Sequence, residues 1–149
     1  MDLLPDQVLI PCGGGGLSSG CSVALKSLVK NVEIFAVEPS NFDDTARSIQ
    51  SGKRQRVQDH ASSICDSLQT PIPGKLTFDI NRELLSGVLT VTDEEVKEAI
   101  RFSFKHFKIV VEPGGAVALA AILFGKVNTK NKITAIVLSG GNIDLDLFN

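Results

Sequence analysis

Four consecutive glycines, Gly13 to Gly16, are the residues of this chain whose type and spacing point most directly to chemistry. They lie between a short apolar run, Val8 to Ile10, and a stretch with helical periodicity. Without Cβ atoms the backbone can turn tightly and direct several N–H groups into one concavity. The positive end of the following helix adds to the attraction for an anion. The loop therefore predicts a phosphate site, because a simple tight turn does not require four glycines.

The identity of the phosphate ligand stays open at this level. Gly14, Gly16 and Gly20 fit a relaxed dinucleotide fingerprint, G-x-G-x-x-x-G. Glu38 ends the next apolar run, where an acid that binds the ribose of NAD is expected. An NAD-type oxidoreductase domain is therefore one interpretation. A strand, loop, helix and strand with a glycine loop can produce the same pattern around other ligands. A second interpretation is therefore a non-catalytic module that binds a phosphate ligand or a partner.

The elements around this loop alternate between strand and helix. Val8–Ile10 and 34–37 are apolar and short, as buried strands are, and 17–30 has the apolar spacing of a helix. A right-handed parallel crossover is the expected geometry for such a unit. A further helix is expected at 43–51, and strands at 88–91 and 133–138. The chain is thus predicted to be a single α/β domain, 1–149, with a mainly parallel twisted sheet and flanking helices.

Two helices are predicted in the second half of the chain. Thr92 and Glu95 have the spacing of a capping box, which opens a helix that we expect to end near Phe107. An Ala-rich helix is expected from the Pro113 turn to about Phe124. The first of these helices is predicted to bury four apolar side chains on its inner face: Val96, Ile100, Phe104 and Phe107.

The composition excludes several classes of function. Fifteen basic and seventeen acidic residues give a net charge of -2, which argues against a nucleic-acid surface. No apolar stretch approaches the length of a membrane span, and the start of the chain lacks the features of a secretory signal. The three cysteines, Cys12, Cys21 and Cys65, have no C-x-x-C spacing. We therefore expect a cytoplasmic protein with reduced thiols.

Four segments taken together resemble one family of enzymes. In order and spacing, GGGGLSSG (13–20), VEPSNFDD (37–44), VVEPGGAVALAA (110–121) and LSGGN (138–142) are similar to the second half of fold-type-II pyridoxal-phosphate (PLP) enzymes. The most similar group is the serine/threonine dehydratases with serine racemase. The resemblance covers nearly the whole chain, including the CDSLQTPIPG segment and the helix start at VTDEEV. It implies the large-domain fold of these enzymes.

The resemblance also implies which residues bind the cofactor. The glycine loop, with Gly13, Gly14, Gly15, Gly16 and the Leu17 amide, corresponds to the phosphate site of the family. Two further residues correspond to positions at the cofactor ring. Ser139 would hydrogen-bond the pyridine nitrogen, or else only cap a strand end, and Glu112 would tune the site near the ring, or else cap the next helix.

A divalent-cation site is implied by the EPSNFDD segment. Glu38 and Asp44 would supply carboxylates and Phe42 a carbonyl oxygen, a set of ligands that suits Mg²⁺ or Ca²⁺. The family has a small residue in place of Phe42, but a carbonyl ligand tolerates that difference. The other interpretation of Asp44 is that it favours a helix N-terminus.

The lysine that binds PLP covalently in this family lies in an S-F-K-x-R-type motif, and this chain contains no such motif. The resemblance thus implies the C-terminal portion of the PLP-binding domain, with no regulatory domain and no activity on its own. The implied reaction of the parent enzyme is deamination of a small 3-hydroxy amino acid, such as L-threonine or L-serine, to a 2-oxo acid and ammonia. The implied partners are the missing N-terminal half or further copies in a homo-oligomer.

Overall fold

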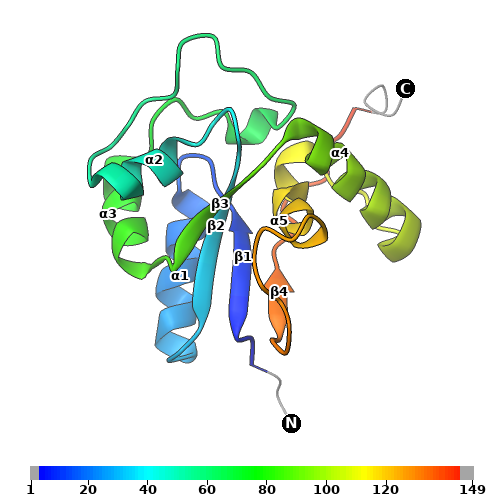
Figure 1. Ribbon diagram of the computed structural model, residues 1–149, viewed down its shortest axis with the longest axis horizontal. Helices are drawn as coiled ribbons and strands as arrows, with labels where there is room; N and C mark the ends of the chain where they lie inside the picture. The colour runs from blue at the N-terminus through cyan, green and yellow to red at the C-terminus, as the bar shows by residue number, and fades with distance from the viewer. Residues whose placement is uncertain (1–3, 145–149) are drawn as a thin grey trace.

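The computed structural model describes residues 4–144, which alternate between strands and helices (Figure 1). The first half of the chain contains β1 (Gln7–Pro11), α1 (Gly16–Leu28), β2 (Glu33–Pro39), α2 (Asp44–Ser51) and a 3₁₀ turn, η1 (Asp66–Leu68). The second half contains α3 (Lys75–Leu84), β3 (Gly87–Val91), α4 (Asp93–Phe102), the π-helix η2 (Ser103–Phe107), α5 (Pro113–Leu123) and β4 (Thr134–Ile136).

The four strands form one parallel sheet in the order β3-β2-β1-β4. Val8 of β1 lies opposite Ile34 of β2 and Ala135 of β4, so β1 is central and β4 forms an edge. All strands run in the same direction, and their carboxyl ends therefore meet at one end of the sheet. The predicted α/β class with a parallel sheet is confirmed.

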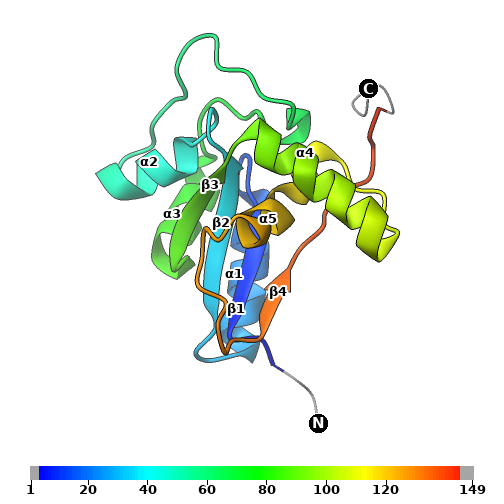
Figure 2. The same cartoon turned by 45° about the vertical axis from the view of Figure 1, so that its right-hand side comes forward.

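Helices cover both faces of this sheet (Figures 1 and 2). Because successive side chains of a strand point to opposite faces, Leu9 faces the core around α5, whereas Val8 and Ile10 face the core around α1. Every residue of α5 from Pro113 to Ala121 is buried, which small side chains make possible because they let a helix lie close to both the sheet and α4. The two cores together fix the strands that carry the functional loops.

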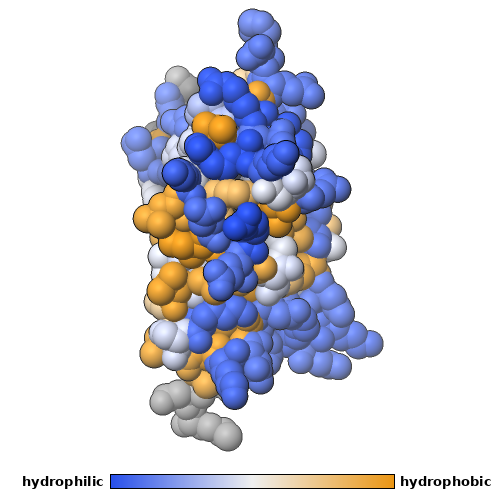
Figure 3. All heavy atoms as spheres, turned by 90° about the vertical axis from the view of Figure 1, so that its left-hand side faces the viewer, coloured by the Kyte–Doolittle hydropathy of each residue, from blue (hydrophilic) through white to orange (hydrophobic). Residues whose placement is uncertain are grey.

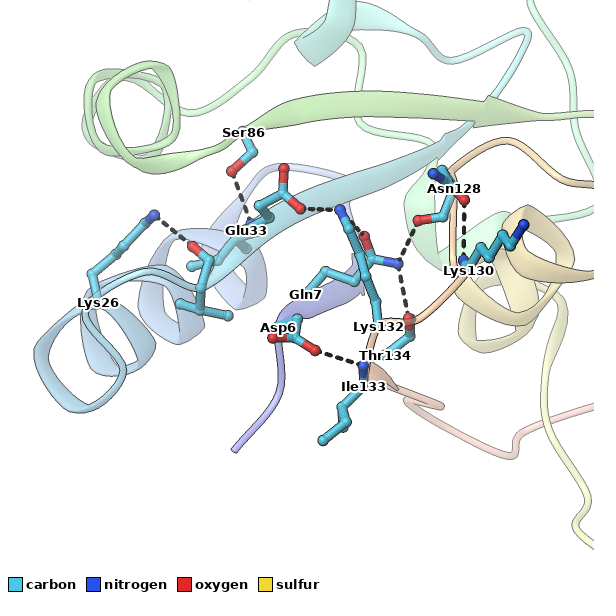
Figure 4. A network of polar contacts seen from close by, with 12 residues as sticks. Asp6, Gln7, Lys26, Glu33, Ser86, Asn128, Lys130, Lys132, Ile133 and Thr134 are labelled. Carbon is cyan, nitrogen blue, oxygen red and sulfur yellow. Dashed lines mark hydrogen bonds and ion pairs between the residues drawn. The ribbon is translucent and has the colours of Figure 1, made fainter. Parts of the chain in front are cut away.

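Polar side chains at the amino ends of the strands hold β4 against β1 and β2 (Figure 4). The buried Gln7 side chain donates from Nε2 to the Thr134 hydroxyl at 2.8 Å and to the Asn128 carbonyl at 3.2 Å. Lys132 forms an ion pair with Glu33 of β2. Buried polar groups are tolerated when they are paired in this way. This network lies at the opposite end of the sheet from the glycine loop.

The capping box at the start of α4 is confirmed. The Glu95 amide donates to the Thr92 hydroxyl at 3.2 Å, and the Thr92 amide donates to the Glu95 carboxylate at 2.8 Å. The end of this helix differs from the prediction, because α4 passes into the π-helix η2 at Ser103. The extra residue per turn rotates the following side chains. Val96 and Ile100 are buried as expected, but Phe104 is 62% and Phe107 47% exposed, so their predicted burial was wrong.

The last strand is also shorter and more exposed than predicted. Pairing covers only Thr134–Ile136 of the expected 133–138, and Ile133 is 44% exposed. A strand at the edge of a sheet has one neighbour rather than two, which accounts for the greater exposure of β4. Figure 3 shows the side on which α2 and α3 lie, where hydrophobic patches alternate with hydrophilic residues. Within residues 4–144, no helix is both long and apolar enough to cross a membrane.

Candidate functional site

The glycine loop joins β1 to α1 and presents open backbone amides. Within the described residues, the N–H groups from Gly13 to Leu17 donate to no protein acceptor, whereas the neighbouring Cys12 amide donates to the Val37 carbonyl at 2.9 Å. Gly16 and Leu17 are exposed. The first amides of a helix have no partner within the helix, and they attract anions. The loop therefore fits a phosphate group. That it binds the cofactor phosphate stays a prediction.

Residues of α3 hold the loop from behind. The Gly14 carbonyl accepts the Thr77 hydroxyl at 2.6 Å and the Gly74 amide at 3.2 Å. Gly15 has a φ of 88°, in the left-handed region, and a Cβ there would lie 2.9 Å from the Asn81 side-chain nitrogen. Asn81 also donates to the Ser18 hydroxyl at 2.9 Å. The glycine is required here both by the backbone conformation and by the contact.

The segment around η1 closes the other side of the loop. A Cβ on Gly13 would lie 3.1 Å from the Leu68 Cα, and one on Gly14 would lie 3.5 Å from the Thr70 hydroxyl. The same segment reaches the start of α5, because a Cβ on Gly114 would lie 2.1 Å from the Ser67 hydroxyl. The η1 segment thus connects the glycine loop to the turn that carries Glu112.

The turn that follows β4 contains Ser139 and covers residues 138–142; this Ser139 turn is held by the residues at the start of α5. The Glu112 amide donates to the Gly140 carbonyl at 3.2 Å, and the Glu112 carboxylate accepts the Asn142 amide at 3.1 Å. A Cβ on Gly115 would lie only 1.9 Å from the Ser139 carbonyl oxygen. Of the two interpretations of Glu112, the structure supports contact with the Ser139 turn, because its side chain makes no capping hydrogen bond to α5.

The two predicted ends of the cofactor site lie at the same edge of the sheet. The glycine loop follows β1 and the Ser139 turn follows β4, and these strands are direct neighbours. Their pairing extends one step beyond β4, since the Val137 amide donates to the Leu9 carbonyl at 3.0 Å. Ligands of parallel α/β sheets bind at the carboxyl ends of the strands. The arrangement therefore allows one small ligand to contact both turns.

Glu38 and Asp44 occupy the next turn along this edge, after β2. Both side chains are fully buried. The Glu38 carboxylate accepts the amides of Thr45 and Ala46 at 3.0 Å each and so caps α2, a role that the sequence suggested for Asp44. Both Asp44 carboxylate oxygens lack a hydrogen-bond partner among the described residues. A buried carboxylate without a partner is costly, so this position fits a cation.

Burial changes the acidity of these groups. Desolvation, followed by the Asp44 charge, raises the pKa of Glu38 to about 8, while the Thr45 and Ala46 contacts oppose the shift. Desolvation likewise raises the pKa of Asp44 to about 7, against the lowering effect of its own backbone amide and of Arg47. The buried Cys12 thiol has a pKa raised to about 12, first by desolvation and then by Glu38. A thiol of that acidity is no nucleophile at neutral pH.

The remaining sequence predictions have mixed outcomes. Lys26 donates to the Val32 carbonyl at 2.7 Å, away from the glycine loop. Phe42 is buried and its amide donates to Pro39 at 2.9 Å; its role as a carbonyl ligand stays a prediction. No group of three or more His, Cys, Asp or Glu side chains in the described range could hold a metal, and the expected site contains only two carboxylates.

Sequence reasoning missed the residues that support the glycine loop from other elements. Thr77 and Asn81 lie 63 residues from their partners Gly14 and Ser18. The only local signal for them is their spacing of one helical turn, which places both on the same face of α3. Such a spacing does not identify the partner.

Comparisons with known proteins agree with this geometry. Residues 1–140 match the family described as pyridoxal-phosphate dependent enzyme. The chain is 43% identical over 143 residues to a serine racemase of Dictyostelium discoideum, covering 94% of this chain and 44% of that protein. It is 38% identical over 151 residues to an L-threonine ammonia-lyase of Thermotoga maritima, covering 100% of this chain and 37% of that protein.

Solved structures show the same relationship. A threonine deaminase of T.th. superimposes with a TM-score of 0.89 and 40% identity, covering 96% of this chain and 51% of the other. The chain spans less than half the length of the curated relatives named above. The glycine loop, the Ser139 turn and these matches lead to one conclusion: the chain belongs to the family of pyridoxal-phosphate dependent enzymes.

Proposed function

We propose that this chain forms the phosphate-binding and ring-binding part of a PLP-dependent ammonia-lyase. The reaction is the α,β-elimination of a small 3-hydroxy amino acid, such as L-threonine or L-serine, to a 2-oxo acid and ammonia. One observation carries the proposal: the unpartnered amides of Gly13 to Leu17 follow the strand that pairs with β4, which leads to Ser139. The relatives named as threonine ammonia-lyase and threonine deaminase support this reaction class.

The chain's own residues would divide the work of holding the cofactor. PLP, when bound, supplies an electron sink for the bond that breaks at the substrate Cα. The loop amides would hold its phosphate, and the Ser139 hydroxyl would meet its ring nitrogen. A neutral hydroxyl cannot keep a proton on that nitrogen as a carboxylate does, and a weaker sink suits elimination. Glu112 would act by holding the backbone of the Ser139 turn, through its bond to the Asn142 amide.

We propose that the covalent lysine comes from sequence outside this chain. The chain lacks a complete S-F-K-x-R segment: Ser103-Phe104-Lys105 is followed by His106 and Phe107 and forms the π-helix η2, away from the glycine loop in sequence. Lys26, in the helix after the glycine loop, donates to the Val32 carbonyl just before β2. The curated relatives are more than twice as long as the part matched. The isolated chain is therefore expected to be inactive and to need a lysine-bearing partner segment. Further copies in a homo-oligomer are the other proposed partners, although they would not supply this lysine. Three free cysteines support a cytoplasmic location.

A divalent cation, Mg²⁺ or Ca²⁺, is proposed beside Asp44. The Asp44 carboxylate is buried without a partner, and a cation would neutralise it together with Glu38. The third ligand of the proposed set is the Phe42 carbonyl. The support is the chemistry of the oxygen donors, which is the chemistry that these cations prefer.

The same residues weigh against a nicotinamide dinucleotide. Glu38 has the sequence position of a ribose-binding acid, but its side chain is fully buried. Both of its carboxylate oxygens accept backbone amides of α2. A ribose needs an accessible acceptor, so this geometry supports PLP over NAD as the ligand of the glycine loop.

Cofactor titration of the pure chain tests the proposal. PLP is expected to bind with a change in its absorbance, pyridoxal without phosphate is expected to bind far more weakly, and NADH is expected not to bind. Adding the unmatched part of the Dictyostelium discoideum serine racemase is expected to produce 2-oxo acid from L-serine or L-threonine. Binding of NADH in preference to PLP, or 2-oxo acid production by the pure chain, contradicts the proposal.

A further inference from the structure

We infer that Thr77 is a positioning residue that aims the Gly15 N–H into the phosphate site. The inference rests on the proposed function, because it assigns a task to a residue behind the proposed phosphate loop. Thr77 lies in the first part of α3, on a different element from the loop. Its hydroxyl donates to the Gly14 carbonyl at 2.6 Å, the shortest of the side-chain contacts to the loop backbone in the described residues.

The geometry of the peptide bond relates this contact to the direction of the Gly15 N–H. Gly14 and Gly15 share one peptide group, and the structure has no cis peptide bond among the described residues. In a trans peptide the C=O and the N–H point in opposite directions. Because the Gly14 carbonyl is held toward α3 by Thr77 and by the Gly74 amide at 3.2 Å, the Gly15 N–H points away from α3. That amide has no protein acceptor in residues 4–144.

Close packing keeps the Thr77 hydroxyl in place. A Cβ on Gly74 would lie 2.7 Å from this oxygen, and one on Gly15 would lie 2.9 Å from it. The hydroxyl therefore fills the space behind the loop. A glycine peptide would otherwise rotate easily, since glycine populates both signs of φ. The hydroxyl thus supplies the restraint that glycine itself lacks.

Three variants separate this role from general stability. Thr77→Val keeps the shape and removes the donor, Thr77→Ser keeps the donor, and Thr129→Val makes the same change at an exposed loop residue. The affinity of each for PLP and for inorganic phosphate is measured by titration. The orientation of the Gly15 N–H is measured by its residual dipolar coupling, and thermal melting reports folding.

Thr77→Val is expected to weaken PLP and phosphate binding about three- to tenfold, as one lost hydrogen bond predicts, and to change the Gly15 coupling. The affinities of Thr77→Ser and Thr129→Val are expected to stay within about twofold of the wild-type affinity, because neither change removes a contact to the loop. An unchanged Gly15 coupling in Thr77→Val overturns the inference. A wild-type chain that binds neither PLP nor phosphate overturns the proposed function instead, and the Gly15 coupling still decides the role of Thr77.

Discussion

The two ends of the proposed cofactor site are built in different ways. The glycine loop is enclosed by α3 on one side, through Thr77 and Asn81, and by the η1 segment on the other. The Ser139 turn is half-exposed, and in the described residues it depends on the first residues of α5. The phosphate end is thus fixed by several elements, whereas the ring end depends on one. A change at α5 should therefore displace the ring end and leave the loop intact.

A pH titration is expected to give the largest effect, and it acts on the turn after β2, which neighbours the glycine loop at the same end of the sheet. Glu38 and Asp44 have pKa values raised to about 8 and about 7, so the folded state holds protons that the unfolded state releases near pH 4. The stabilisation that these two protonated groups contribute is therefore complete below pH 4 and is lost as the pH rises toward 8. We expect a loss on the order of 3 kcal/mol between pH 5 and 8, measured by denaturation.

Asp44→Asn provides the control for this titration, because an amide cannot ionise. The slope of stability against pH is expected to become flatter in this variant, and also in wild type with added Mg²⁺. A wild-type chain whose stability rises from pH 5 to 8 would show that these carboxylates are ionised at little cost.

Gly115→Ala is expected to break the ring end. The new Cβ would lie 1.9 Å from the Ser139 carbonyl oxygen, so the Ser139 turn must move. Overpacking of this kind costs about 1–3 kcal/mol, which urea denaturation would measure. Gly20→Ala is the matched control, since a Cβ there meets nothing within 4 Å. Amide NMR shifts that change at Gly13–Gly16 as much as at Ser139 would contradict the separation of the two ends.

Gly15→Ala is expected to disturb the phosphate end instead. The left-handed conformation of Gly15, with a φ of 88°, costs a residue with a Cβ about 1–2 kcal/mol. The Cβ would also press on Thr77 and Asn81. We expect weaker PLP binding with the amide signals of the Ser139 turn unchanged. Equal PLP affinity in Gly15→Ala and Gly20→Ala would show that the loop is less constrained than its contacts indicate.

Glu112→Ala should give the smallest effect. It removes the acceptor of the Asn142 amide and is expected to cost about 1 kcal/mol. Glu112→Gln keeps a carbonyl acceptor and should retain most of the stability. Hydrogen exchange at the Asn142 amide checks the contact directly: the rate should rise in the alanine variant and stay near the wild-type rate in the glutamine variant. Equal rates in all three proteins would remove Glu112 from the support of the turn.

Local patterns in the sequence predicted the elements that depend on neighbouring residues. The capping box of Thr92 and Glu95 is an example, because its contacts lie within a few residues. The position of the glycine loop between β1 and α1 was likewise predicted from consecutive residues, although the contacts that support it are long-range. Phe104 and Phe107 were misplaced because a single π-turn changes the helical periodicity on which the prediction depended. No residue type in this segment predicts a π-turn.

Long-range contacts explain what else the sequence did not reveal. The bond of Thr77 to Gly14 crosses 63 positions, and the placement of Gly115 against Ser139 requires the fold to bring the start of α5 beside the turn that follows β4. For Glu38, the sequence suggested a role but not the contacts of the side chain. It was selected as a ligand from its position, and its amide contacts to α2 became visible only in three dimensions.

The exposed edge of β4 has a consequence for how the site meets solvent. The Ile133 carbonyl accepts the Gln7 amide and the Val137 amide donates to the Leu9 carbonyl, so the N–H and C=O groups of Thr134 and Ile136 point away from β1. Any polypeptide strand that bonds to them would widen the sheet and run alongside Ser139. Water reaching that serine would then have to pass the added strand, so the polarity around the hydroxyl would depend on the neighbour that completes the sheet.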